Sequence, residues 1–285
     1  MIAPSSPTAA DSEGGWEAAL ELGYARRGER TVPTHRRHRG PIRVQKHHEP
    51  ELGVCQHILV HPPAGMAGGD SVDVDVAVGP GAHAQLTTPG ATPWYRSAGP
   101  VARQSVRARV DAGATLELLP REHLVFDGAE VVIDTDVTLA ADARLVMWDI
   151  VALGRPHGDA PFTRGRVHAD ARIWRAGALV WCDRMRLAAD DRRRASALGL
   201  GGADVCATLV VAAPGRALAL DACHDVETPD PAGARAGITD LGGLVIGRWL
   251  GAAVEPARRW LEAMWQRLRP QALDRPAVPP RIWRT

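Results

Sequence analysis

The feature that most constrains the fold is a strict alternation of apolar and polar residues along several segments. From residue 72 to residue 78 every second residue is valine, with aspartates between the first of them. The same period of two recurs in residues 16–22, 105–110 and 131–139. Because successive side chains of a β-strand point to opposite faces, this pattern predicts strands with one buried face.

Turn-forming residues separate these segments at fairly regular intervals. They are Gly79-Pro80-Gly81, Ala98-Gly99-Pro100, Asp111-Ala112-Gly113, Asp127-Gly128 and Ala176-Gly177. Strands divided in this way predict an all-β architecture, which can be a sandwich, a barrel or a stacked β-helical layer. Residues 144–153 and 178–187 are more continuously apolar, so we expect these two strands to be buried on both faces.

Two segments depart from the strand pattern. An apolar stripe at helical spacing is preceded by a first-turn acid and proline and followed by another proline: Glu255, Pro256, Trp260, Leu261, Met264, Trp265, Leu268 and Pro270. This predicts a helix over about 255–269, stopped by Pro270. A second, weaker helix is predicted from Ala188 to Leu198. We expect a single domain over 16–285, after a disordered segment at 1–15 that is small and polar.

Bulk composition excludes several classes of protein. The 34 Lys and Arg residues balance 33 Asp and Glu, so no general attraction to nucleic acid or to an anionic membrane follows. The four cysteines form neither a C-x-x-C pair nor a compact disulfide framework. The sequence shows neither a signal-peptide pattern nor an apolar run of about 18 residues. We therefore expect a cytoplasmic protein with reduced thiols.

Two loops carry unusual composition. HPPAGMAGGD, at 61–70, combines prolines and glycines that fix an unusual backbone path, and its last residue, Asp70, can cap it. The local sequence favours a structural turn, since no Gly-Lys-Ser/Thr ending is present. LTTPGATPWYRS, at 86–97, offers threonine hydroxyls and an aromatic pair. It is equally consistent with a docking surface and with a plain hairpin connection.

Two carboxylates interrupt apolar strands. Asp149 lies in LVMWDIVALG and Asp183 lies in LVWCDRMRL. A buried carboxylate is costly unless it is paired, hydrogen-bonded, in contact with a metal or beside water. For Asp183 an ion pair with Arg184 or Arg186 is the favoured explanation. Asp149 has no basic neighbour nearby in the sequence, so its burial requires another reason.

The search for other chemistry finds little. Cys223-His224-Asp225 contains three metal-ligand types, but adjacent residues of a strand point to opposite faces, which prevents them from sharing an ion. His47 and His48 lie in polar, Arg-rich sequence and are typical of a solvated surface. There is no G-x-S-x-G motif for a serine nucleophile. Nothing in the sequence indicates an enzyme.

Six segments, taken in order, resemble the successive signatures of the urease accessory protein D family, called H in some organisms. They are GPIRVQ (40–45), HPPAGMAGGD (61–70), LTTPGATPWYRS (86–97), LPREHLVFDGA (119–129), WDIVALGRP (148–156) and PRIWRT (280–285). The resemblance extends from about Trp16 to Thr285. Four positions differ from the family pattern, which usually has Gly, Lys, Gln and Glu near Ala64, Pro93, Arg121 and Asp159, and His47-His48 replaces what is often an aromatic pair.

The resemblance implies a β-helix-like, multi-stranded fold with a few helices and no catalytic activity. It implies binding to accessory protein F, which recruits the GTPase accessory protein G, and docking onto apo-urease. It also implies an internal polar passage through which nickel moves in transit, with no tightly bound cofactor. Asp70, Asp149, Asp183 and Thr92 match positions that line this passage in the family. An open, acid-lined passage suits an ion that must be held weakly enough to leave.

Two other functions remain open from the residues alone. One is a β-rich scaffold whose loops hold partner proteins, with no metal path. The other is an all-β hydrolase with dispersed His and Asp ligands, against which the missing nucleophile motif and ligand pairs count. Within the family interpretation, we expect the apolar stripe of the C-terminal helix and the tail from Ala277 to Thr285 to form part of the surface for accessory protein F.

Overall fold

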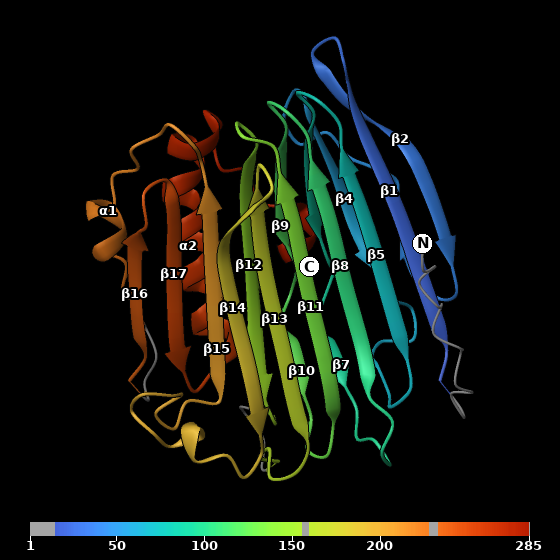
Figure 1. The fold of residues 1–285 in the computed structure, drawn as a ribbon, viewed down its shortest axis with the longest axis vertical. Coiled ribbons are helices and arrows are strands. Elements are labelled where there is room, and N and C mark those ends of the chain that lie inside the picture. The colour runs from blue at the N-terminus through green and yellow to red at the C-terminus, as the bar shows by residue number, and fades with distance from the viewer. Residues whose placement is uncertain (1–14, 156–159, 228–232, 285) are drawn as a thin grey trace, which may run out of the picture.

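The computed structural model describes residues 15–155, 160–227 and 233–284. Residues 1–14 of the segment expected to be disordered, and Asp159, lie outside these ranges. The described residues form two stacked β-sheets with a long helix near the C-terminal end (Figure 1). The expected all-β architecture, with β-helix-like stacked sheets and its clearest helix near the C-terminus, is confirmed.

The sheet nearer the viewer in Figure 1, here called the front sheet, has seven strands in the order β14-β13-β11-β8-β5-β1-β2. They are β1 (Glu17–Arg27), β2 (Arg30–Arg39), β5 (Ser71–Val78), β8 (Ala102–Val110), β11 (Glu130–Leu139), β13 (Arg166–Arg175) and β14 (Ala178–Ala188).

The second layer, here called the back sheet, has ten strands, of which β7 and β10 form a side branch next to β12. They are β3 (Arg43–Val44), β4 (Val54–Val60), β6 (His83–Thr87), β7 (Thr92–Trp94), β9 (Thr115–Leu119), β10 (His123–Val125), β12 (Arg144–Leu153), β15 (Val205–Ala212), β16 (Arg235–Asp240) and β17 (Leu244–Gly251).

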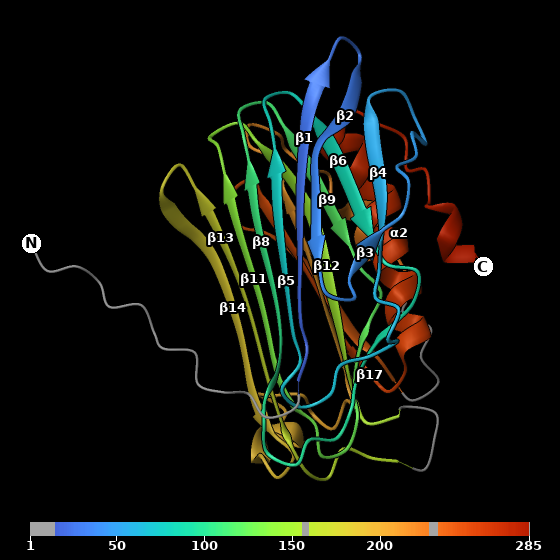
Figure 2. The ribbon, with the colours of Figure 1, turned by 90° about the vertical axis from the view of Figure 1, so that its right-hand side faces the viewer.

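From β4 to β13 the chain passes repeatedly from one sheet to the other, so each front-sheet strand is followed in sequence by a strand of the back sheet (Figure 2). Successive strands of the front sheet therefore pair in parallel, as β5 does with β8, β8 with β11 and β11 with β13. In this register Val76, Ala108, Val137 and Ile173 form one buried row across four strands. The row explains why the same alternation recurs in successive segments.

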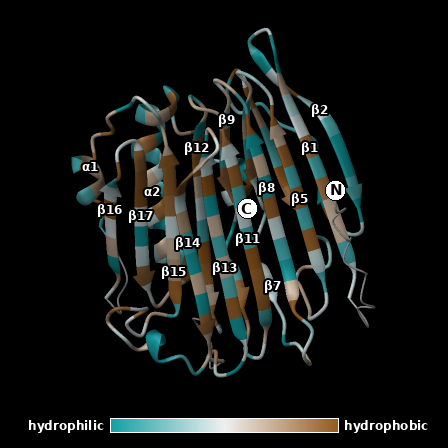
Figure 3. Cartoon of the chain, viewed as in Figure 1, coloured by the Kyte–Doolittle hydropathy of each residue, from teal (hydrophilic) through white to brown (hydrophobic). Residues whose placement is uncertain are grey.

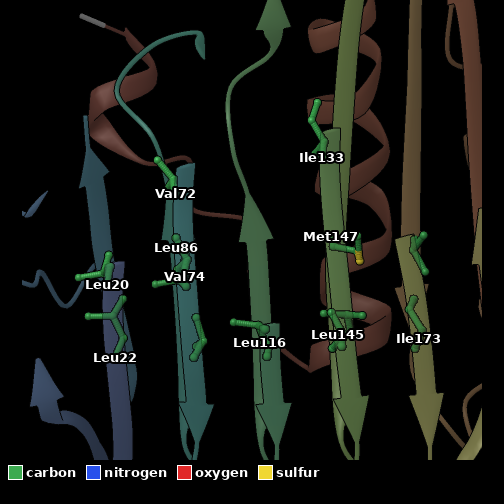
Figure 4. Close-up of a cluster of buried hydrophobic side chains, with 14 of the residues drawn as sticks. Leu20, Leu22, Val72, Val74, Leu86, Leu116, Ile133, Leu145, Met147 and Ile173 are labelled. Carbon is green, nitrogen blue, oxygen red and sulfur yellow. The ribbon is translucent and has the colours of Figure 1, made fainter. Parts of the chain in front are cut away.

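The alternating residues divide into an inner and an outer face of the front sheet, visible as alternating colours along β5, β8 and β11 in Figure 3. The inner side chains meet those of the back sheet in one apolar core, where Val74 and Ile133 of the front sheet lie near Leu116 and Met147 of the back sheet (Figure 4). The outer face carries ion pairs, such as Arg107 Nε with Asp75 Oδ1 at 2.7 Å. This confirms the predicted buried and solvated faces.

Helix α2 (Val254–Leu273) covers the outer face of the back sheet (Figure 2). Its predicted apolar stripe is fully buried there, with Trp265 and Leu268 at 0% exposure. The expectation that this stripe binds a partner protein is therefore wrong, because the strands of the same chain already cover it. Pro270 does not stop the helix either: it lies in the last turn, and the helix ends where Asp274 takes a left-handed φ of 56°.

In the described part of the chain, three shorter helices lie in loops: the 3₁₀-helices η1 (Arg192–Arg194) and η2 (Arg281–Arg284), and the α-helix α1 (Asp221–His224). The predicted helix from Ala188 to Leu198 is wrong, since turns and η1 occupy that segment. The expectation that 178–187 is buried on both faces is also wrong. This segment is β14, an edge strand with Leu179 and Val180 exposed. The prediction for 144–153, which is β12, is confirmed because core side chains cover both faces.

A buried polar network joins the back sheet to α2. Glu117 on β9 is 0% exposed and accepts hydrogen bonds from Trp265 Nε1 at 2.8 Å and from Arg269 Nε at 2.9 Å. The His83 ring also lies 2.8 Å from this carboxylate, and Gln85 donates to it at 3.2 Å. Arg269 is itself only 1% exposed. A carboxylate and a guanidinium can be buried here because each satisfies the other.

This network predicts a pH dependence of stability. Burial by itself raises the pKa of Glu117, but the hydrogen bonds and charges of His83 and Arg269 outweigh it and lower that pKa to about 2. An unfolded glutamate titrates at about 4.3. The stabilisation is therefore present above about pH 4.3 and lost as pH falls toward about 2. Urea unfolding measured from pH 5 to pH 2 should show a steeper loss for the wild type than for Glu117→Gln; parallel curves would contradict it.

Candidate functional site

A cavity of about 710 Å³ lies between the two sheets. Such a volume is within the range of small-ligand cavities, about 300–1,000 Å³. Most of its lining is apolar core, and its polar lining residues come from both layers and the nearby loops: His61, Thr87, Thr88, Thr92, Gln104, His123, Thr135, Asp149, Asp170, Asp183, Arg184, Arg186, Arg193, Thr208 and Arg248. The candidate site is the part of this cavity around the carboxylates of Asp149 and Asp183.

Asp149 faces this cavity from β12. Its alternate neighbours Met147 and Val151 belong to the core between the sheets, whereas Trp148 and Ile150 belong to the core under α2. Asp149 therefore points inward, and its Oδ1 is buried with no hydrogen-bond partner among the described residues. The open cavity is the reason that a carboxylate can occupy an otherwise apolar strand.

An imidazole lies near this oxygen: His123 Nε2 on β10 is 3.5 Å from Asp149 Oδ1. Burial raises the pKa of Asp149, an effect that His123 opposes and that the charge of Asp183 reinforces. Burial also lowers the pKa of His123, against the attraction of Asp149 and Glu122. Both pKa shifts arise because burial disfavours the charged form of each group. A cation placed beside Asp149 would stabilise its carboxylate.

Asp183 reaches the same cavity from the opposite layer. In the antiparallel pairing of β13 with β14, Asp183 lies opposite Ala171, and both residues line the cavity. Its carboxylate forms an ion pair with Arg248 Nη1 of β17, and this nitrogen also donates to Thr208 Oγ1 at 2.9 Å. The predicted ion pair is therefore present with a different partner. Arg184 contributes only its main-chain N–H, at 3.0 Å, and Arg186 pairs with Asp170 instead.

The two loops of unusual composition pack on each other. The Met66 N–H donates to Pro93 O at 2.8 Å, and the Tyr95 N–H donates to Met66 O at 2.7 Å. Ala64, where the family usually has glycine, takes a φ of 56°, a left-handed conformation that glycine adopts without steric cost. The structural interpretation of the first loop is thus favoured, and residues of both loops line the cavity, with Thr92 contributed by the second.

Asp70 differs from the other predicted site residues. Its Oδ2 accepts the Ala67 N–H at 2.6 Å and its Oδ1 accepts the Trp16 N–H at 3.2 Å. It does not line the cavity. The structure therefore brings together Asp149, Asp183 and Thr92, and it places Asp70 as the cap of its own loop.

Sequence reasoning did not single out two residues beside Asp149. His123 lies inside one of the family segments, and its contact with Asp149 depends on the side branch of β7 and β10. Cys206 on β15 also lines the cavity. Burial, reinforced by Asp149 and Asp183, raises the pKa of its thiol to about 12. At neutral pH it is therefore a thiol and not the thiolate that binds metals.

Across residues 15–155, 160–227 and 233–284, no group of three or more His, Cys, Asp or Glu could hold a metal ion. Cys223 and His224 belong to helix α1, so the expectation that they lie on opposite faces of a strand is wrong. In this helix Cys223 is buried and His224 is exposed. In the same described part of the chain, no helix has the length and apolarity needed to cross a bilayer. The cavity offers isolated ligands and no closed metal site.

Comparison with known proteins identifies the family. The family model described as UreD urease accessory protein matches residues 17–284. The UreD urease accessory protein of Pseudomonas aeruginosa is 48% identical over 274 residues, which cover 95% of each chain. That of Nitrosococcus oceani is 45% identical over 271 residues, covering 95% of this chain and 90% of the relative. The resemblance found in the six segments is confirmed: this chain belongs to the UreD family of urease accessory proteins, which are not themselves enzymes.

Proposed function

We propose that this protein delivers nickel toward the active site of apo-urease through the cavity between its two sheets. In this proposal it acts as a maturation factor in an assembly with accessory protein F, the GTPase accessory protein G and the urease subunits. Nickel is cargo, and no cofactor is tightly bound. The observation that carries the proposal is the Asp149 carboxylate, which faces an internal cavity with one oxygen lacking a hydrogen-bond partner among the described residues.

The chemistry of the lining suits an ion in transit. A divalent cation and its water shell can use the free oxygen of Asp149, and Thr92 and Thr208 supply neutral oxygen atoms on the same cavity. Asp183 contributes a second carboxylate, which its ion pair with Arg248 partly neutralises. Such dispersed oxygen ligands attract Ni²⁺ without closing around it, so the ion can move on. The role of Asp70 in the passage stays a prediction.

Replacing Asp149 with Asn tests the passage. The amide keeps the shape of the side chain but removes the negative charge, so we expect urease matured with this variant to contain less nickel and to be less active, by about tenfold or more. The measurement is nickel per urease active site after co-expression with the other accessory proteins. Asp183→Asn combined with Asp149→Asn should lower nickel content further.

A matched control is Asp136→Asn. Asp136 has a side-chain exposure of 34%, close to the 33% of Asp149, but it pairs with Arg172 and does not line the cavity. Urease matured with this control should have normal nickel content. Normal nickel content with a folded Asp149→Asn chain would refute the passage and favour the alternative, a β-rich protein-binding scaffold with no metal-conducting role.

A further inference from the structure

A buried indole fixes the hydrogen-bonding state of the imidazole beside Asp149. Strands β7 and β10 pair in parallel, with Trp94 opposite Val125 and Thr92 opposite His123, so Trp94 and His123 are diagonal neighbours across the two strands. Trp94 is 0% exposed and His123 is 4% exposed. The indole Nε1 lies 3.1 Å from His123 Nδ1, within hydrogen-bond distance.

The direction of this hydrogen bond follows from the chemistry of the two rings. An indole N–H can only donate, so His123 Nδ1 must be the acceptor and carries no proton. A neutral imidazole has one N–H, which is then at Nε2. This nitrogen is the one that lies 3.5 Å from Asp149 Oδ1. His123 therefore presents an N–H, and not a lone pair, to the carboxylate.

A metal ion at Asp149 would need the opposite arrangement to use this imidazole. Binding through Nε2 requires a lone pair there, which moves the proton to Nδ1. Two N–H groups, of Trp94 and His123, would then face each other across 3.1 Å in a buried site. Losing a buried hydrogen bond and opposing two donors is costly, so the indole disfavours the ligating form.

We propose that Trp94 holds the single proton of the neutral His123 ring at Nε2, the nitrogen on the side of Asp149, and thereby prevents the imidazole from binding nickel at this carboxylate. Trp94 is then a positioning residue, which acts through His123. This inference rests on the proposed function, because it concerns the ion that would pass Asp149. Imidazole is a good ligand for nickel, so a carboxylate and an available imidazole side by side would retain the ion. The hydrogen bond from Trp94 leaves the carboxylate and water as ligands.

The first test is the position of the proton. Nitrogen-15 NMR of the full-length wild-type chain should show a protonated Nε2 and an unprotonated Nδ1 for His123. A protonated Nδ1 would overturn the proposal without any variant.

The second test removes the donor. Trp94→Phe takes away the indole N–H, so the isolated full-length chain should bind Ni²⁺ about tenfold more tightly in calorimetry. X-ray absorption of the bound nickel should show imidazole in this variant and none in the wild type. The double variant Trp94→Phe with His123→Gln should lose the gain. Trp249→Phe is the control for lost volume: this indole is also 0% exposed, and its N–H has no partner among the described residues.

The outcomes separate this inference from the proposed function. A folded Trp94→Phe chain with wild-type nickel affinity, or wild-type nickel already bound to imidazole, would disprove the role of Trp94. Tighter binding by Trp94→Phe, together with normal urease nickel content for Asp149→Asn, would support the role of Trp94 and reject the passage. Should Trp94→Phe fail to fold, the NMR and X-ray absorption results on the wild type still decide the proposal.

Discussion

Glu117→Ala is expected to lower the free energy of unfolding by about 3–5 kcal/mol, the usual cost of breaking one half of a buried ion pair. The truncation removes the carboxylate that accepts from Trp265 and Arg269, and it leaves a guanidinium with 1% exposure short of its main partner. Glu51 also pairs with Arg269 and retains part of the compensation. Urea unfolding at pH 7 measures the effect.

The control lies in helix α2, which carries Trp265 and Arg269 of this network. Glu255 pairs with Arg259 one turn away, and both side chains are more than half exposed. Because water screens such a pair, Glu255→Ala should cost no more than about 0.5 kcal/mol. Similar losses for the two variants would show that the network around Glu117 contributes no more than a surface ion pair.

Ala171→Phe is expected to reduce nickel delivery more strongly than Asp149→Asn, because it fills the passage and does not merely change its charge. Ala171 lines the cavity next to Asp183. The added ring can enter space that is already open, so the cost of overpacking should remain below the roughly 1–3 kcal/mol seen in filled cores. Nickel per urease active site is the measurement, with unfolding in urea to verify the fold.

Ala112→Phe is the comparison, since it adds the same ring at an exposed turn outside the cavity. It should leave nickel content and stability unchanged. If a stable Ala171→Phe chain matures urease fully, nickel does not travel between the two sheets, and the cavity has another role.

The strands of the front sheet were predictable because the alternation of buried and exposed side chains is a local property of each strand. One face of β5, β8 or β11 is core and the other is solvent, so a period of two is visible in each segment alone. The pairing of these strands in parallel, and their division between two layers, depends on contacts far apart in the sequence. For that reason the residues alone left a sandwich, a barrel and a β-helical layer open.

The errors in the fold have local causes. The apolar residues of 178–187 suggested a buried strand, but among the described strands β14 is at the edge of the front sheet, and its Leu179 and Val180 are exposed. Residues 188–198 are rich in Ala and Arg, which favour helices, yet Gly199 packs its backbone against Arg193 O in a tight turn. A Cβ on Gly199 would lie 2.0 Å from that oxygen, so tertiary packing outweighs helix propensity here.

The candidate site was predictable only in part. Asp149 and Asp183 stood out because a carboxylate in an apolar strand requires an explanation, and both line the cavity. His123 gave no such signal, since its position depends on the branch that β7 and β10 form beside β12. Glu117 was likewise not predicted to be buried. Its burial depends on α2, whose Arg269 is 152 residues further along the chain.

This separation has a consequence for the order of synthesis. Helix α2 leaves the ribosome only after every strand that it covers. A growing chain that already contains β4 to β17 therefore lacks the helix that buries the outer face of its back sheet. Until residues 254–273 emerge, the outer face of the back sheet exposes Trp148, Trp249 and the Glu117 carboxylate to water. Such surfaces promote aggregation of nascent chains. Translation that stops before residue 254 should therefore yield an insoluble product, although every strand of both sheets has been made.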